Sequence, residues 1–260
     1  MKLKGKKPSP IGKNRKRQSS NEDEKEPIDR TVVREQIDQF VRILMKDFPR
    51  KIVEIDQLRR KEFNYERMKL KCLTTETELE RYFPKLNSKV EIDKYQQMYT
   101  IADFSSCSFL FPNGMIPINR SADELVQILL DQLEDLQRYL FECCMTIELI
   151  IPSYEKRSAF EYSLLQDLLS EFRRVLKWAN TQYGTAETLI LDFHGQEMIK
   201  IANYPQYEDL RKAFIRSEKK QLKELVTIVN YLFFLYLTMM DIVCKNGDKL
   251  GMLLTKARNG

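Results

Sequence analysis

Three short junctions divide this chain into long segments in which apolar residues recur at helical spacing. The junctions are residues 111–117, 150–160 and 201–210, and each contains proline. Proline ends or bends a helix because it has no backbone N–H and its ring collides with the preceding turn. Glycine is scarce, with 8 in 260 residues, so tight hairpins and glycine-rich phosphate loops are poorly supplied. The sequence therefore predicts an all-α fold.

The first long segment, residues 29–63, has the pattern of an amphipathic helix. Its apolar positions are Val33, Ile37, Phe40, Val41, Leu44, Phe48, Ile52, Ile55 and Leu58. Pro49 lies inside it, so we expect a kink there and not two independent helices. Residues 64–120 lose the period and contain several prolines, which predicts a long linker with at most a short helical piece near residues 76–82.

A capping box, Ser121 with Glu124, predicts the start of a second helix that ends before Pro152. The helical period returns after the bend and predicts a third helix to about residue 201, with glycines 184 and 195 as weak points.

A last helix is expected from about residue 207 to residue 245, followed by a frayed tail over 247–260. Four helices of this length predict one domain, residues 29–260, folded as an elongated antiparallel four-helix bundle.

The stretch Leu225 to Cys244 in the last helix is the most hydrophobic part of the chain. By length it could span a membrane, and a membrane-anchored protein remains an alternative. Asn230 and Asp241 lie inside it, however, and the other helices have ordinary amphipathic stripes. We favour burial by the bundle on one side and by a second copy of the chain on the other, which predicts a homo-oligomer and no membrane partner.

The net charge of +5 is located mainly in a tail, residues 1–28. The first 17 residues hold eight Lys and Arg and no acid, which leaves about −3 for the rest, and an acidic stretch, residues 22–26, follows. The folded part has mixed charges, so no nucleic-acid partner is expected. We interpret the basic cluster as a nuclear-import patch, although a solvated disordered arm would look the same. The residues of the patch are Lys13, Arg15, Lys16 and Arg17.

Catalytic chemistry has little support in the sequence. The only histidine, His194, has no obvious nucleophile near it in the sequence, and the five cysteines form no C-x-x-C pair. Nucleotide-binding and metalloprotease motifs are absent, so we expect no cofactor, no metal and no enzyme activity. The odd number of cysteines favours reduced thiols inside the cell.

Five short pieces of the sequence are informative through their order and spacing. They are Phe48-Pro49-Arg50-Lys51, Pro112-Asn113-Gly114-Met115, Leu149-Ile150-Ile151-Pro152, Lys200-Ile201-Ala202-Asn203-Tyr204-Pro205-Gln206-Tyr207-Glu208-Asp209 and Asp241-Ile242-Val243-Cys244-Lys245-Asn246. Together they resemble the ATP-independent REG (11S) proteasome activator family, most closely its gamma-type subunits. The resemblance implies a heptameric ring of four-helix subunits that caps the alpha ring of the 20S core proteasome and opens its gate without ATP hydrolysis. A helical scaffold or interaction protein without activating capacity is the alternative.

The resemblance also implies two contact segments. The activation loop lies within residues 152–163, between the second and third helices, on Pro152, Ser153, Tyr154, Glu155, Lys156, Arg157, Ser158, Ala159 and Phe160. After Glu155, relatives typically have an acidic-glycine-asparagine run, whereas this chain is basic. The C-terminal docking tail corresponds to Lys256, Ala257, Arg258, Asn259 and Gly260.

Overall fold

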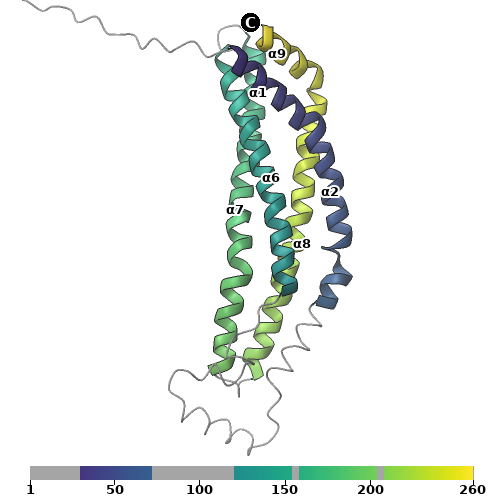
Figure 1. Ribbon diagram of the computed structural model, residues 1–260, viewed down its shortest axis with the longest axis vertical. Helices are drawn as coiled ribbons and strands as arrows, with labels where there is room; N and C mark the ends of the chain where they lie inside the picture. The colour runs from purple at the N-terminus through teal and green to yellow at the C-terminus, as the bar shows by residue number, and fades with distance from the viewer. Residues whose placement is uncertain (1–29, 72–119, 154–157, 204–207, 260) are drawn as a thin grey trace, which may run out of the picture.

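A computed structural model describes residues 30–71, 120–153, 158–203 and 208–259, and in these ranges the chain forms helices and no strand (Figure 1). The elements are α1 (Arg30–Arg42), the π-helical turn η1 (Ile43–Asp47), α2 (Phe48–Lys61), α6 (Arg120–Ile150), the 3-10 turn η3 (Ile151–Ser153), α7 (Ala159–Asn203), α8 (Glu208–Lys245) and α9 (Gly247–Asn259). The long helices lie side by side as an elongated bundle. The predicted all-α, antiparallel four-helix fold is confirmed.

The first helical segment is continuous but kinked. The backbone N–H of Phe48 donates to the carbonyl of Ile43, five residues earlier, and Pro49 follows in the first turn of α2. A π turn next to proline is a known cause of a helix kink. Helix α1 therefore crosses the upper part of α6 in Figure 1, while α2 continues downward along α8. The prediction of a kink at Pro49 is confirmed.

The remaining long helices begin and end close to the residues that the sequence predicted. Helix α6 stops at Ile150, two residues before Pro152, and α8 starts at Glu208. Helix α7 is 45 residues long, about 68 Å at 1.5 Å per residue, and passes through both Gly184 and Gly195 without a break.

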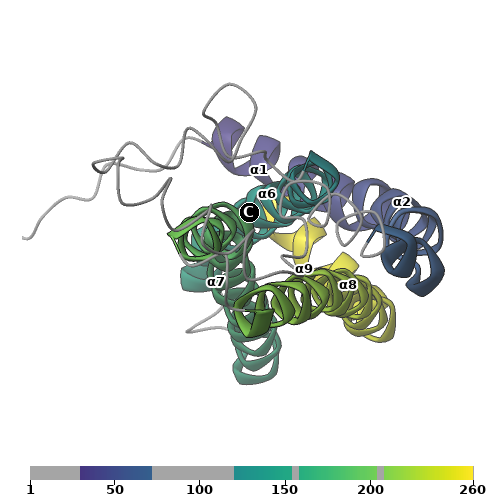
Figure 2. The same cartoon turned by 90° about the horizontal axis from the view of Figure 1, so that it is seen from below.

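The core runs along the axis of the bundle, where α6 packs on α7 and α8 packs on α2 and α7 (Figure 2). Phe48 is fully buried at the kink, with its ring 6.2 Å from the ring of Tyr139 and 5.2 Å from that of Tyr236, both edge-on. Edge-to-face aromatic contacts add to the burial of apolar area. The kink is thus held by packing on α6 and α8.

Helix α8 is, among the described helices, long and apolar enough to span a membrane by length and composition. It nevertheless packs on α2, α6 and α7, and one face is buried from Phe214 to Val243. A second face is exposed at Tyr231, Phe234 and Leu237. This division between a packed and an open face supports the interpretation as a bundle helix.

The C-terminal segment corrects the sequence prediction. Residues 247–259 were expected to be frayed, but they form α9, which folds back on α1. Its Leu250, Leu253 and Leu254 are 3%, 1% and 7% exposed. Burial of three leucines stabilises a helix that local signals did not predict, because two glycines and a C-terminal position disfavour it.

Two other predictions fall wholly or partly outside the described residues. The basic N-terminal tail lies there, and so does most of the linker, including residues 76–82. Of the linker, residues 65–71 are helical, and the Asn64 side chain accepts a hydrogen bond from the backbone N–H of Arg67 at 2.8 Å. This is an ordinary N-cap.

Candidate functional site

The bend between α6 and α7 is fixed at both ends. On the α6 side, Ile150 is buried and η3 carries the chain through the exposed Pro152. On the α7 side, Ser158 accepts a hydrogen bond from the backbone N–H of Glu161 through its side chain, 3.3 Å, and from that of Tyr162 through its carbonyl, 3.0 Å. Residues 154–157 lie outside the described ranges. The two described ends make the bend a short connection between rigid helices.

The start of α7 also contacts the C-terminal part of the chain. The Lys249 ammonium lies 4.9 Å from the centroid of the Phe160 ring, and that ring is 59% exposed. An ammonium over an aromatic face is attracted by the ring quadrupole. Helix α9 is therefore a direct neighbour of the bend.

Two ion pairs tie the end of α9 to the bundle. The Lys256 ammonium lies 2.7 Å from the Glu161 carboxylate, and the Arg258 guanidinium lies 3.3 Å from the carboxylate of Asp38. Arg34 donates a hydrogen bond from Nε to the carbonyl of Arg258 at 3.0 Å. We call this set, with Glu161 on α7 and Arg34 and Asp38 on α1, the C-terminal clasp. Each exposed ion pair contributes little, typically below about 1 kcal/mol, so the buried leucines hold most of α9 in place.

The two segments that the sequence singled out therefore meet at one end of the bundle, near the C-terminus marked in Figure 1. Lys256 belongs to the predicted docking tail, and Glu161 follows directly on the predicted loop residues. The sequence reasoning did not single out Glu161. The sequence does contain a pattern that marks this residue, because Ser158 and Glu161 have the S-x-x-E spacing of a capping box at a helix N-terminus.

The described residues contain no group of three or more His, Cys, Asp or Glu placed to hold a metal ion. Burial raises the pKa of the Cys144 thiol to about 11 and that of Cys143 well above its usual value. Both thiols are therefore protonated near neutral pH and poor nucleophiles. The side chain of His194 and the basic cluster at residues 13–17 are outside the described residues.

An aromatic ridge lies along α7 and α8, half-buried at Trp178 and exposed at Tyr231 and Phe234. The ring of Tyr231 stands edge-on to Trp178 at 5.0 Å and stacks on Phe234 at 6.0 Å. Phe234 is 56% exposed, and Leu237 continues the ridge one turn further along α8. A run of large apolar side chains in solvent is typical of a protein contact surface.

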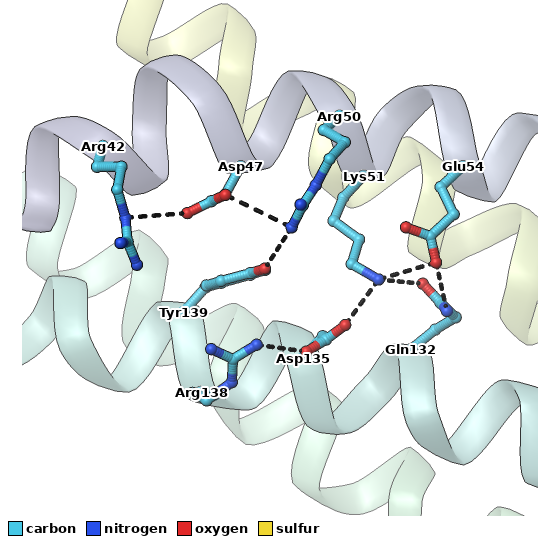
Figure 3. A network of polar contacts seen from close by, with 9 residues as sticks. All are labelled: Arg42, Asp47, Arg50, Lys51, Glu54, Gln132, Asp135, Arg138 and Tyr139. Carbon is cyan, nitrogen blue, oxygen red and sulfur yellow. Dashed lines mark hydrogen bonds and ion pairs between the residues drawn. The ribbon is translucent and has the colours of Figure 1, made fainter.

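A polar network joins α2 to α6 in the middle of the bundle (Figure 3). The buried Lys51 ammonium donates to Glu54 at 2.9 Å and to Gln132 at 3.0 Å, and lies 2.6 Å from the Asp135 carboxylate. Three acceptors match the three protons of an ammonium group. Arg138 donates to the other oxygen of Asp135 at 2.5 Å. Lys51 belongs to one of the pieces that carry the family resemblance, but nothing in the sequence indicates that its side chain is buried or that Asp135 is its partner.

The pKa values of this network follow from its contacts. Burial acts to lower the pKa of Lys51, but hydrogen bonds to Asp135 and Glu54 outweigh it and raise the pKa. Burial acts to raise the pKa of Asp135, and hydrogen bonds from Lys51 and Arg138 outweigh it and lower the pKa. The Asp135 contribution to stability is thus present above the unfolded pKa of 3.8 and lost as pH falls through the lower folded value. The Lys51 contribution to stability is fully present below the unfolded pKa of 10.5 and is lost only as pH rises through the higher pKa of Lys51 in the folded protein.

Replacing Asp135 with Ala is expected to lower the free energy of unfolding by about 2 kcal/mol at pH 7, because the buried Lys51 loses its nearest carboxylate but keeps Glu54 and Gln132. Urea unfolding at fixed protein concentration measures this. Asp131→Ala, on the exposed face of the same helix, is the control and should cost much less. The difference in the free energy of unfolding between the two variants should disappear in acid, below the pKa of Asp135 in the folded protein. Equal losses in the two variants at pH 7 would show that the network adds no stability.

Comparisons with known proteins agree on one family. The family model "Proteasome activator PA28, C-terminal" matches residues 115–254. "Proteasome activator complex subunit 3" of Homo sapiens and of Mus musculus are each 27% identical over 146 residues, 55% of this chain and 56% of theirs. The match thus spans about half the length of these relatives. The crystal structure of the 11S subunit of the Plasmodium falciparum proteasome, PA28, has a similar fold, with a TM-score of 0.59 and 14% identity over 88% of this chain and 92% of that one.

Proposed function

This chain belongs to the PA28 proteasome activator family, and from that premise we propose that it is an ATP-independent activator of the 20S core proteasome. In this proposal, identical subunits form a ring on the proteasome alpha ring, the C-terminal residues dock, and the bend between α6 and α7 opens the gate. The gamma-type subunits are the proposed subgroup. The chain regulates a peptidase and is not itself an enzyme.

The observation that carries the proposal is the meeting of the bend and the C-terminal helix at one end of the bundle. The 2.7 Å contact between Lys256 and Glu161 links them directly. A surface that must touch one partner at two points needs both points on the same face. Helices α6 and α7 pack along each other and fix the positions of the two described ends of the bend.

Assembly into a homo-oligomer, with seven subunits by family resemblance, is supported by the aromatic ridge of Trp178, Tyr231, Phe234 and Leu237. Repeated tails on one ring would dock cooperatively, because after the first contact the others are intramolecular. The bend would then shift the gate by contacting its open form better than its closed form.

Nuclear localisation is a separate part of the proposal. Its support is the sequence of the basic cluster Lys13, Arg15, Lys16 and Arg17.

The test of the proposed function is peptide hydrolysis by purified 20S proteasome with saturating amounts of this protein. Stimulated turnover of short fluorogenic peptides is the expected result. Unchanged turnover by an assembled ring that binds the core particle would contradict activation and point to a scaffold.

The double variant Lys156→Glu, Arg157→Glu reverses the charge of the bend. We expect it to reduce stimulation by about tenfold, since a loss of about 1.4 kcal/mol in preference for the open gate has that effect. Native mass should stay the same. The matched control reverses two exposed lysines far from the bend in sequence, Lys61 and Lys220. Full stimulation by the bend variant would show that these side chains do not act on the gate.

A further inference from the structure

A groove lies between the helical residues 65–71 and the first half of α8, on the part of the bundle away from α9. Its volume is about 560 Å³, within the range of about 300–1,000 Å³ that is usual for binding pockets. The described lining residues are Tyr65, Met68, Lys69, Lys219, Leu222, Lys223, Val226 and Thr227. The groove is remote from the bend and from the C-terminal clasp, so the proposed function does not use it.

The floor and rim of this groove differ in chemistry. Met68 and Leu222 are 4% and 3% exposed, and with Val226 they form an apolar floor. Lys69 lines one wall, and Lys219 and Lys223 lie one turn apart on the other. Lys69 and Lys223 are exposed, so each wall presents a positive charge to solvent. The described lining includes no carboxylate. The nearby Glu62 carboxylate lies 2.9 Å from the Arg67 guanidinium and is paired there.

An apolar floor between two cationic walls complements one kind of partner. A helical peptide can place apolar side chains at positions i, i+3 and i+4 in a groove while its flanking residues face the rim. Carboxylates at the flanking positions would meet lysines from both walls. Charge complementarity of this type sets which partner is accepted and how fast it binds.

We propose that the groove formed by Met68, Leu222 and Val226 under Lys69, Lys219 and Lys223 binds an acidic amphipathic helical segment of a partner protein. Apolar side chains of that segment occupy the floor, and its glutamates or aspartates pair with Lys69 and Lys223. The site can bind such a segment without the proteasome, so its test is independent of peptidase stimulation.

The test measures fluorescence anisotropy of a labelled synthetic helix that has leucines at i, i+3, i+4 and i+7 and glutamates at the flanking positions. One control peptide replaces the glutamates with lysines, and another scrambles the same composition to remove the helical spacing. We expect saturable binding of the acidic helix by the full chain and little binding of either control peptide.

The double variant Lys69→Glu, Lys223→Glu should weaken binding by about tenfold or more, because it reverses one charge on each wall. Its matched control is Lys61→Glu, Lys220→Glu, which changes one exposed lysine on each side outside the groove lining and should bind normally. Circular dichroism and native mass establish that both variants keep the fold and assembly.

Four results with the peptides and the variants would overturn the proposal. They are no saturable binding of the acidic helix, equal affinity for the scrambled peptide, equal weakening by the two double variants, and a smaller native mass for Lys69→Glu, Lys223→Glu. The last would make the groove a contact between copies of the chain. Binding to vesicles of anionic phospholipid in place of the peptide would also overturn it.

Discussion

Replacing Phe234 with Asp is expected to reduce the native particle to single folded subunits. Phe234 is 56% exposed and stacks on Tyr231 in the aromatic ridge, so the folded subunit itself loses little packing. In a contact between subunits, the new carboxylate would be buried without a partner, and a central aromatic residue would be lost. Loss of such a contact can lower the free energy of association by roughly 2 kcal/mol or more. In a ring, the same loss occurs at every interface between subunits.

Native mass spectrometry or light scattering over a dilution series measures this effect. The control is Phe234→Leu, which keeps an apolar side chain and should keep the assembly. Circular dichroism should show the same helix content in both variants. If the Asp variant retained the full particle mass, the aromatic ridge would not be a subunit contact.

Removing residues 256–260 is expected to return peptide hydrolysis by the 20S proteasome to its unstimulated level. The truncation deletes the proposed docking contact from every subunit at once, and multivalent binding is lost together with its individual contacts. The buried Leu250, Leu253 and Leu254 remain, so most of α9 keeps its packing. The measurement is the stimulation of peptide hydrolysis, made at a concentration at which the untruncated protein saturates the 20S proteasome.

Truncation also breaks the contact between Lys256 and Glu161, and a control must separate the two effects. Glu161→Gln weakens the same contact from the other side and leaves the tail intact. We expect this variant to stimulate at least as well as the full chain, because release of the clasp leaves more of the tail available to dock. An equal loss in both would show that the clasp, and not a docked tail, supports activity.

The course of the long helices could be predicted because their signals are local. Pro152 and Pro205 set boundaries that the structure reproduces within a few residues, and the kink at Pro49 follows from the chemistry of one residue. The bend was located from the same signals. Its role in gating came from family resemblance and stays a proposal.

The parts that could not be predicted depend on contacts between residues far apart in the chain. Lys51 and Asp135 are 84 positions apart, and neither has a sequence pattern that marks it as buried. Lys256 and Glu161 are 95 positions apart, and their contact needs α9 to exist first. The cap formed by Ser158 is the exception, because its S-x-x-E spacing lies within four residues and is readable from the sequence.

The sequence by itself determined that this protein is helical and where its main helices end, because backbone hydrogen bonding, proline geometry and apolar periodicity act within a few residues. Only the tertiary structure decided that the C-terminal segment is a helix and that its end lies beside the bend. A segment with weak intrinsic helix propensity folds when it can bury leucines against neighbours, and those neighbours, α1 and the start of α7, come together only in the assembled bundle.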